Sequence, residues 1–175
     1  MTIDQIKQAY SEFDSAQRKA RPTLVRDTVK GIWGPSSVDN VYELFQKINL
    51  KQYRNFLDIG CGDGRVVLVA SLFTKATGIE FDKELVEAGK HINQKLNLKA
   101  HLIQDDFYNH DFSKYDLIFT NPDTGFYNGM EDKLLKELNG LLLVYNNTFL
   151  PRFLKRGKTY WINGIPITIY QRENR

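Results

Sequence analysis

FLDIGCGDGRVV, residues 56–67, is the stretch of sequence that decides the fold. Its first residues are apolar strand formers, which predicts a buried strand rather than an edge strand. Gly60, Gly62 and Gly64 then alternate, and glycine lets the backbone turn sharply and lets a ligand approach the main chain. The apolar residues that follow predict a helix that continues to Phe73. Strand, glycine turn and helix together predict a ligand site at the turn.

The glycine spacing differs from the two common nucleotide-binding patterns, because G-x-G-x-x-G is not matched and no lysine follows the last glycine. Leu57 to Gly64 instead resembles the first motif of the class I methyltransferases that use S-adenosylmethionine, and further matches extend from about Trp33 to Tyr170. In that family an acid at the position of Asp58 contacts the amino group of the cofactor. The resemblance assigns the turn to the methionine part of the cofactor, through Gly60, Cys61, Gly62 and Asp63. Carboxylates suit this cofactor, which carries a cationic amine and a sulfonium.

Composition and length bound the class of protein. The chain has 175 residues, 42% of them hydrophobic and 26% charged, as expected for one ordinary globular domain over residues 1–175. A single cysteine, Cys61, excludes an intrachain disulfide. The sequence has no signal-peptide pattern and no membrane span, so we expect a cytoplasmic protein without a membrane partner. The three histidines do not cluster with cysteine at ligand spacing, so no metal site is predicted.

Cations gather in two parts of the chain, although the net charge is only +3. One group comprises Arg18, Lys19, Arg21, Arg26 and Lys30. The other comprises Arg152, Lys155, Arg156, Lys158, Arg172 and Arg175, against Glu173 alone. Such patches either bind phosphates or an acidic partner, or they are simply a solvent-exposed charged surface.

Strands and helices alternate along the chain after an N-terminal helical segment of residues 1–50. That segment contains two predicted helices, over the first 20 residues and from 38 to 49, joined by a loop in which Trp33 either plugs the core or lines a substrate mouth. Strands are predicted at 56–59, 75–80, 99–104, 115–120 and 141–145, with helices at 66–73, after Asp82 and at 130–138. This order predicts an α/β, doubly wound, mostly parallel sheet with helices on both faces. Asn163-Gly164 predicts a C-terminal antiparallel hairpin between residues 159–162 and 165–170, which is also how the resembled family ends.

Ligands of an open parallel sheet bind at the carboxyl ends of its strands, which selects further residues. Glu80, followed by Phe81, ends the second strand, and its two carboxylate oxygens suit a pair of ribose hydroxyls. Asp105 and Asp106 precede Phe107 at the end of the third strand. An acid there can accept a hydrogen bond from the adenine amino group, and the family pattern favours Asp106.

The methyl acceptor is expected after the fourth strand, at Asn121, Pro122 and Asp123. This loop partly resembles the Asn-Pro-Pro-aromatic motif of enzymes that methylate amide or adenine nitrogens and hold a planar NH2 group. Asp123 stands where the second proline belongs, and a carboxylate is better matched to a cationic alkylamine.

The general layout resembles a group of small archaeal and mitochondrial protein-lysine methyltransferases. The resemblance rests on Gly34-Pro35-Ser36-Ser37, on the first motif and on the helix at 130–138. It implies methyl transfer to an acceptor nitrogen, with a protein lysine as the first hypothesis. The alternatives are a nucleic-acid or protein-amide N-methyltransferase, and a cofactor-binding subunit without catalysis.

Overall fold

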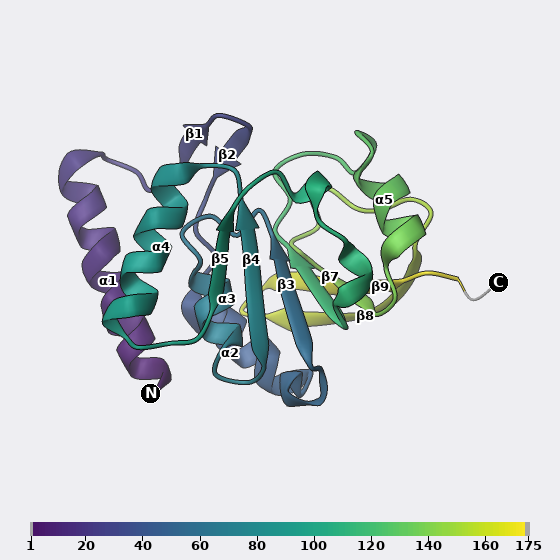
Figure 1. Ribbon diagram of the computed structural model, residues 1–175, viewed down its shortest axis with the longest axis horizontal. Coiled ribbons are helices and arrows are strands. Elements are labelled where there is room, and N and C mark those ends of the chain that lie inside the picture. Colours follow the sequence, from purple (N-terminus) through teal and green to yellow (C-terminus); the bar gives the residue numbers. More distant parts are fainter. Residues whose placement is uncertain (1, 174–175) are drawn as a thin grey trace.

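A seven-stranded sheet forms the centre of the computed structural model, which describes residues 2–173 (Figure 1). Its strand order is β5-β4-β3-β6-β7-β9-β8; the first five strands are parallel, and β9 runs antiparallel to both of its neighbours. The bounds are β3 Asn55–Ile59, β4 Lys75–Glu80, β5 His101–Gln104, β6 Leu117–Thr120, β7 Leu141–Tyr145, β8 Lys155–Ile162 and β9 Ile165–Gln171. The predicted doubly wound, mostly parallel sheet is therefore confirmed.

Helices cover the two faces of this sheet unequally. Their bounds are α1 Ile3–Ala20, α2 Val38–Lys47, α3 Arg65–Ala70, α4 Lys83–Lys95 and α5 Met130–Glu137. Apolar residues of α1 to α4 form one core with the sheet, around the aromatic contacts of Phe45 with Phe56 and Phe119. The opposite face packs against α5, the 3-10 turn η3 (Phe112–Lys114) and apolar residues of the segment between β7 and β8.

Some elements have bounds that differ from the sequence prediction. Helix α3 stops at Ala70, because the Ser71 hydroxyl donates to the Leu68 carbonyl at 2.7 Å and the Thr74 hydroxyl to the Tyr53 carbonyl at 2.5 Å. Such side-chain bonds compete with a helical backbone. Strands β5 and β6 each begin two residues later than predicted.

The loop predicted between the two N-terminal helices contains a short antiparallel hairpin that the sequence analysis did not predict. Strands β1 (Arg26–Thr28) and β2 (Gly31–Trp33) pair as an antiparallel hairpin. The hairpin lies above the carboxyl ends of β3, β4 and β5 (Figure 1). Each strand has only three residues, too few for a period-2 pattern, so the hairpin depends on contacts with the rest of the fold.

The C-terminal hairpin is confirmed, with Asn163 and Gly164 in its turn at φ of 48° and 81°. Two consecutive positive φ angles are those of the turn that Asn-Gly favours. The Asn163 amide also donates to the Asn40 side chain at 2.8 Å, which ties the hairpin to α2. Arg175, which the sequence analysis counted among the terminal cations, lies outside the described residues. Between residues 2 and 173, none of the helices has both the length and the apolar character that a bilayer span requires.

Candidate active site

A cavity of about 460 Å³ opens at the carboxyl ends of β3, β4 and β6, and residues of the β1–β2 hairpin border it. The sequence-predicted residues that border it are Asp58, Gly60, Cys61, Asp63, Glu80, Phe81, Asp106, Phe107, Asn121, Pro122 and Asp123. Gly62 and Asp105, which were predicted with them, do not. The tertiary structure thus brings most of the predicted residues to one cavity, as the strand-end rule requires.

Asp58 is the most unusual group in this cavity. The residue is 2% exposed, and no described residue donates a hydrogen bond to its carboxylate. Burial, followed by repulsion from Glu80 and Asp63, raises the pKa of Asp58 well above its ordinary value. A buried carboxylate without a partner is costly, so this position suits a ligand that brings a positive charge.

Glu80 is held in place by the backbone. The Gly62 N–H donates to its Oε2 at 3.0 Å, and the Asp82 N–H donates to its Oε1 at 2.8 Å. Each carboxylate oxygen keeps lone-pair capacity for a further donor, so a fixed, bidentate acceptor faces the cavity. The Gly62 N–H thus orients Glu80, Gly62 itself does not border the cavity, and its contact with a cofactor stays a prediction.

Gly62 is also covered from the cavity side by an aromatic residue. A Cβ at Gly62 would overlap the Trp33 indole. Trp33 is half-buried and borders the cavity. Of its two predicted roles, the position at the mouth is thus the one that the structure supports.

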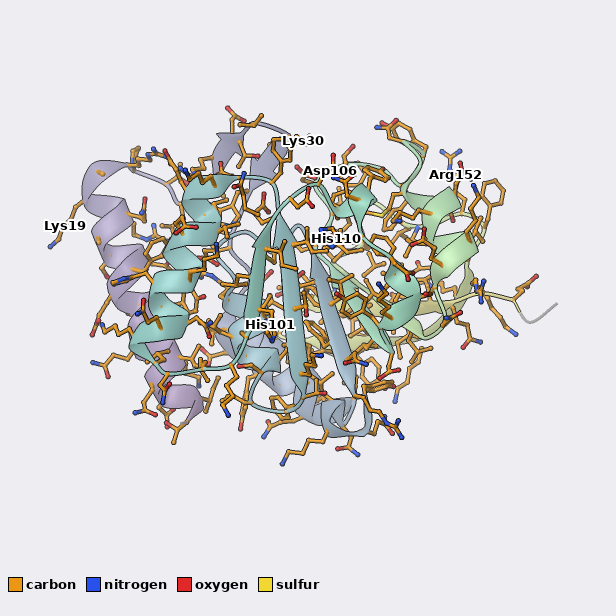
Figure 2. The ribbon with its side chains drawn as sticks, in the orientation of Figure 1. Lys19, Lys30, His101, Asp106, His110 and Arg152 are labelled. Carbon is orange, nitrogen blue, oxygen red and sulfur yellow. The ribbon has the colours of Figure 1, made fainter. Side chains whose placement is uncertain are left out.

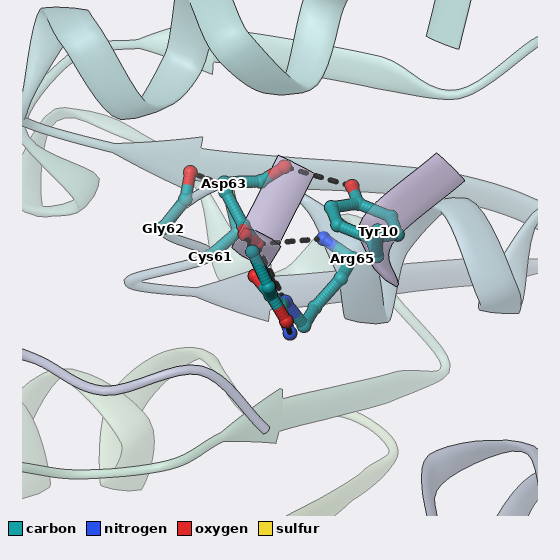
Figure 3. Close-up of polar contacts among 6 residues, drawn as sticks. Tyr10, Cys61, Gly62, Asp63 and Arg65 are labelled. Carbon is teal, nitrogen blue, oxygen red and sulfur yellow. Dashed lines mark hydrogen bonds and ion pairs between the residues drawn. The ribbon is translucent and has the colours of Figure 1, made fainter. Parts of the chain in front are cut away.

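The Asp63 carboxylate forms an ion pair with a neighbouring arginine (Figure 3). The Arg65 guanidinium bonds the Asp63 carboxylate at 2.6 Å and the Asp14 carboxylate of α1 at 2.8 Å. The Tyr10 hydroxyl donates to the Asp63 carbonyl at 2.8 Å, and the Arg65 guanidinium lies 4.7 Å from the centre of the Tyr10 ring. The role of Asp63 is therefore to fasten the glycine turn to α1. The sequence had marked Arg65 only as part of the motif.

Asp105 and Asp106 point in different directions. The Asp105 carboxylate accepts from the Asn109 amide and lies 3.1 Å from the His110 ring, which turns it away from the cavity. Asp106 borders the cavity and pairs with Lys30 of the β1–β2 hairpin, and this bond lowers the pKa of Asp106 (Figure 2). The Lys30 ammonium also lies 4.2 Å from the centre of the Phe81 ring. In the sequence, Lys30 stands out only as one of a group of cations.

The acceptor loop after β6 contains a fixed amide. The Asn121 side chain accepts a hydrogen bond from the Asn146 amide and donates one to the Ser36 hydroxyl at 3.3 Å. Ser36 and Asn146 were not predicted as site residues, although Ser36 lies in the Pro-Ser step that the sequence analysis noted. Among the described residues, none donates to the carbonyl oxygen of Pro122, which borders the same cavity.

Asp123 faces the hairpin. The Ile32 N–H donates to its Oδ2 at 2.6 Å, and a Cβ at Gly31 would overlap the same oxygen. One oxygen of Asp123 is therefore used in fastening the hairpin over the cavity. No described residue bonds its Oδ1.

These residues fit a ligand with a cationic amine and vicinal hydroxyl groups. Asp58 matches the amine, and Glu80 matches two hydroxyls. Within residues 2–173 no group of three or more histidine, cysteine, aspartate or glutamate side chains has the arrangement of a metal site.

Comparison with known proteins gives a family match and similar folds. Residues 56–143 match the family model described as a methyltransferase domain. An uncharacterized protein of Methanocaldococcus jannaschii is 33% identical over 97 residues, which are 54% of this chain and 40% of the relative. The match thus spans about two fifths of the length of that curated relative.

Two solved structures illustrate the similarity of fold. An RNA methyltransferase from Salinibacter ruber, in complex with S-adenosyl-L-homocysteine, has a TM-score of 0.67 and 18% identity, covering 81% of this chain and 96% of the other. The magnesium protoporphyrin IX methyltransferase from Synechocystis, with bound S-adenosylmethionine, has a TM-score of 0.63 and 14% identity, covering 78% of each chain.

Proposed function

The chain belongs to the methyltransferase domain family, and we propose that it is an S-adenosylmethionine-dependent methyltransferase whose acceptor is a planar amino nitrogen held by Asn121 and Pro122. The proteins of similar fold include an RNA methyltransferase and a magnesium protoporphyrin IX methyltransferase. Their names therefore do not indicate which acceptor this chain methylates. The acceptor loop of this chain is the feature that supports the proposal.

The proposed cofactor contacts follow from the chemistry of the cavity. Asp58 binds the ammonium group, because its buried carboxylate has no partner among the described residues. Glu80 accepts from the ribose hydroxyls, and Asp106 accepts from the adenine amino group when Lys30 releases it. When bound, the cofactor supplies a methyl group on a positively charged sulfur, which keeps the electron pair of the broken carbon–sulfur bond.

Two carbonyl oxygens of the loop match the two N–H groups of a planar amine. The amide oxygen of Asn121 accepts one hydrogen bond from Asn146 and has a second lone pair available. The Pro122 carbonyl has no described donor. Holding both N–H groups directs the nitrogen lone pair toward the methyl group. The nitrogen forms the new bond with this lone pair and releases one proton to water.

A lysine amine is the second candidate, and Asp123 is the observation in its favour. Its carboxylate borders the cavity, and its Oδ1 has no described donor. A lysine must first lose a proton from an ammonium group with a pKa of about 10.4, and desolvation would lower that value. We rank this candidate second, because Asp123 is exposed and already engaged with the Ile32 N–H.

Measuring methyl transfer by the variants Asn121→Ala and Asp123→Asn distinguishes the planar amine from the lysine as the acceptor. For a planar amine, Asn121→Ala lowers transfer to the natural substrate in cell extract by at least about tenfold, or ~1.4 kcal/mol in barrier, while Asp123→Asn changes it little. A lysine acceptor reverses this order. Ser36→Ala is the matched control, because it removes a partner of Asn121 but leaves the carbonyl oxygen. Cofactor affinity by calorimetry should stay near the parental value in all three variants. If neither loop variant lowers transfer, the acceptor site lies elsewhere.

A further inference from the structure

A second cavity of about 310 Å³ adjoins the acceptor loop. Gly125 and Phe126 border both this cavity and the cofactor cavity, so the two are separated only by the loop that we propose holds the acceptor. Its volume is at the lower end of the range of ligand pockets, about 300–1,000 Å³. A substrate that presents its acceptor to Asn121 therefore has a place beside it for a neighbouring group. We call this cavity the flanking groove.

Two exposed aromatic rings border the flanking groove. Tyr127 of the acceptor loop is 72% exposed, and Phe153 of the segment before β8 is 73% exposed. Large aromatic side chains are usually buried. Rings left in solvent beside an active site offer flat faces on which planar ligand groups can stack.

Phe153 is exposed on an ordered segment. Glu131 of α5 is buried, and its Oε1 accepts from the N–H groups of Arg152 and Phe153 at 2.6 Å each and of Leu154 at 3.3 Å. Three backbone donors on one carboxylate oxygen fix the direction of the chain. Little conformational freedom is then lost when a ligand binds, which favours affinity.

Arg152 is the cation that borders the flanking groove, and the chain segment that follows it is positively charged. From residue 152 to residue 161 the chain carries four exposed cations and no carboxylate: Arg152, Lys155, Arg156 and Lys158. Phe153 lies between Arg152 and Lys155, and Tyr160 and Trp161 follow the last cation; Trp161 on the edge strand β8 is 64% exposed. Two acids of α5 border the groove: Asp132, which is exposed, and the buried Glu131, whose Oε1 is already bonded to three backbone N–H groups. A run of cations with an exposed ring near each end matches the phosphates and bases of a single-stranded nucleic acid.

We propose that the flanking groove binds the nucleotide next to the methyl acceptor in a single-stranded nucleic acid. Tyr127 and Phe153 stack on the base, Arg152 pairs with the adjoining phosphate, and the cations of β8 continue the path of the strand. This inference rests on the proposed planar acceptor, because it makes that acceptor the exocyclic amine of a nucleobase. It is consistent with the layout in Figure 2, where Arg152 lies on the side of the molecule opposite Lys19.

Fluorescence anisotropy with labelled single-stranded RNA and DNA of about 12 nucleotides tests the inference. The full chain is used with S-adenosylhomocysteine present, at ~50 mM salt and at higher salt. Phe153→Leu keeps an apolar side chain but removes the ring, and we expect affinity to fall about five- to 150-fold. Arg152→Ala should weaken binding and reduce the salt slope by about one. Arg18→Ala is the matched control, because Arg18 is an exposed arginine of α1 next to Lys19.

The outcomes separate this inference from the proposed acceptor. The inference that the flanking groove binds a nucleotide is supported if Phe153→Leu and Arg152→Ala lose affinity for the nucleic acid. In that case Arg18→Ala keeps the parental affinity, and all variants keep the parental melting temperature. Absence of binding at low salt, or an equal loss in Arg18→Ala, overturns it. Displacement of the RNA by an equal concentration of polyglutamate would also overturn it, since charge alone would then explain binding. None of these measurements involves methyl transfer, so the Asn121 experiment still judges the acceptor independently.

Discussion

Replacing Asp58 by asparagine should weaken cofactor binding and at the same time stabilise the ligand-free protein. Asp58 is 2% exposed as a residue and its carboxylate has no described hydrogen-bond donor, so the folded protein bears the cost of burying it. A bound cationic amine offsets that cost. An asparagine side chain at this position would have nearly the same shape without the charge, which removes both the cost and the attraction.

The expected loss of affinity follows from the type of bond. A hydrogen bond to a charged group contributes about 1.5–3 kcal/mol, so the dissociation constant should rise about 10- to 150-fold. The stability effect has the opposite sign. Burial raises the pKa of Asp58 in the folded state, so the folded protein binds more protons than the unfolded chain. Stability therefore falls as pH rises from about 3.9, the ordinary pKa, up to the raised folded pKa.

Two measurements check this reasoning. Titration calorimetry with S-adenosylhomocysteine gives the affinity, and thermal melts of the ligand-free protein across a pH series give the stability. Asp58→Asn should flatten the fall in stability with rising pH, and Asp27→Asn, which removes an exposed carboxylate of β1, should change neither quantity. Parental affinity in Asp58→Asn, or a lower melting temperature at every pH, would refute the assignment of this carboxylate to the cofactor.

Two further predictions concern the parts that hold the site together. Arg65→Met should lower the free energy of unfolding in urea by about 3–5 kcal/mol, because it leaves the buried Asp63 carboxylate without its partner. Adding Asp63→Asn should restore part of this loss. A double variant as unstable as the single variant would contradict the ion-pair explanation. Gly164→Val should destabilise the C-terminal hairpin by about 1–2 kcal/mol, because φ at this position is 81°, and a melting temperature equal to that of the parent would speak against that turn.

Segments with a strong local pattern were predictable from the sequence. Strands β4 (Lys75–Glu80) and β7 (Leu141–Tyr145) match their predicted bounds residue for residue, and Asp82 caps α4 as expected. Asp58 and Glu80 were placed at strand ends by chain order alone. Their place at one cavity followed because parallel strands bring their carboxyl ends to the same edge.

The β1–β2 hairpin could not be predicted, because its stability comes from distant residues. Lys30 pairs with Asp106, Arg26 with Glu84, and the Ile32 N–H with the acceptor loop, all more than 50 residues away in sequence. No periodic pattern in the local sequence predicts such long-range contacts.

The sequence by itself determined that acids and glycines meet at the ends of the parallel strands, and the tertiary structure decided which acids face a ligand. Asp58 and Asp63 belong to the same motif, yet only Asp63 has a cation beside it, since Arg65 begins α3 two residues later and Asp14 holds it there from α1. Asp105 and Asp106 are neighbours, yet His110 and Asn109 turn the first away from the cavity. A carboxylate binds the nearest donors that its fold supplies, so its role depends on partners that residue order does not specify.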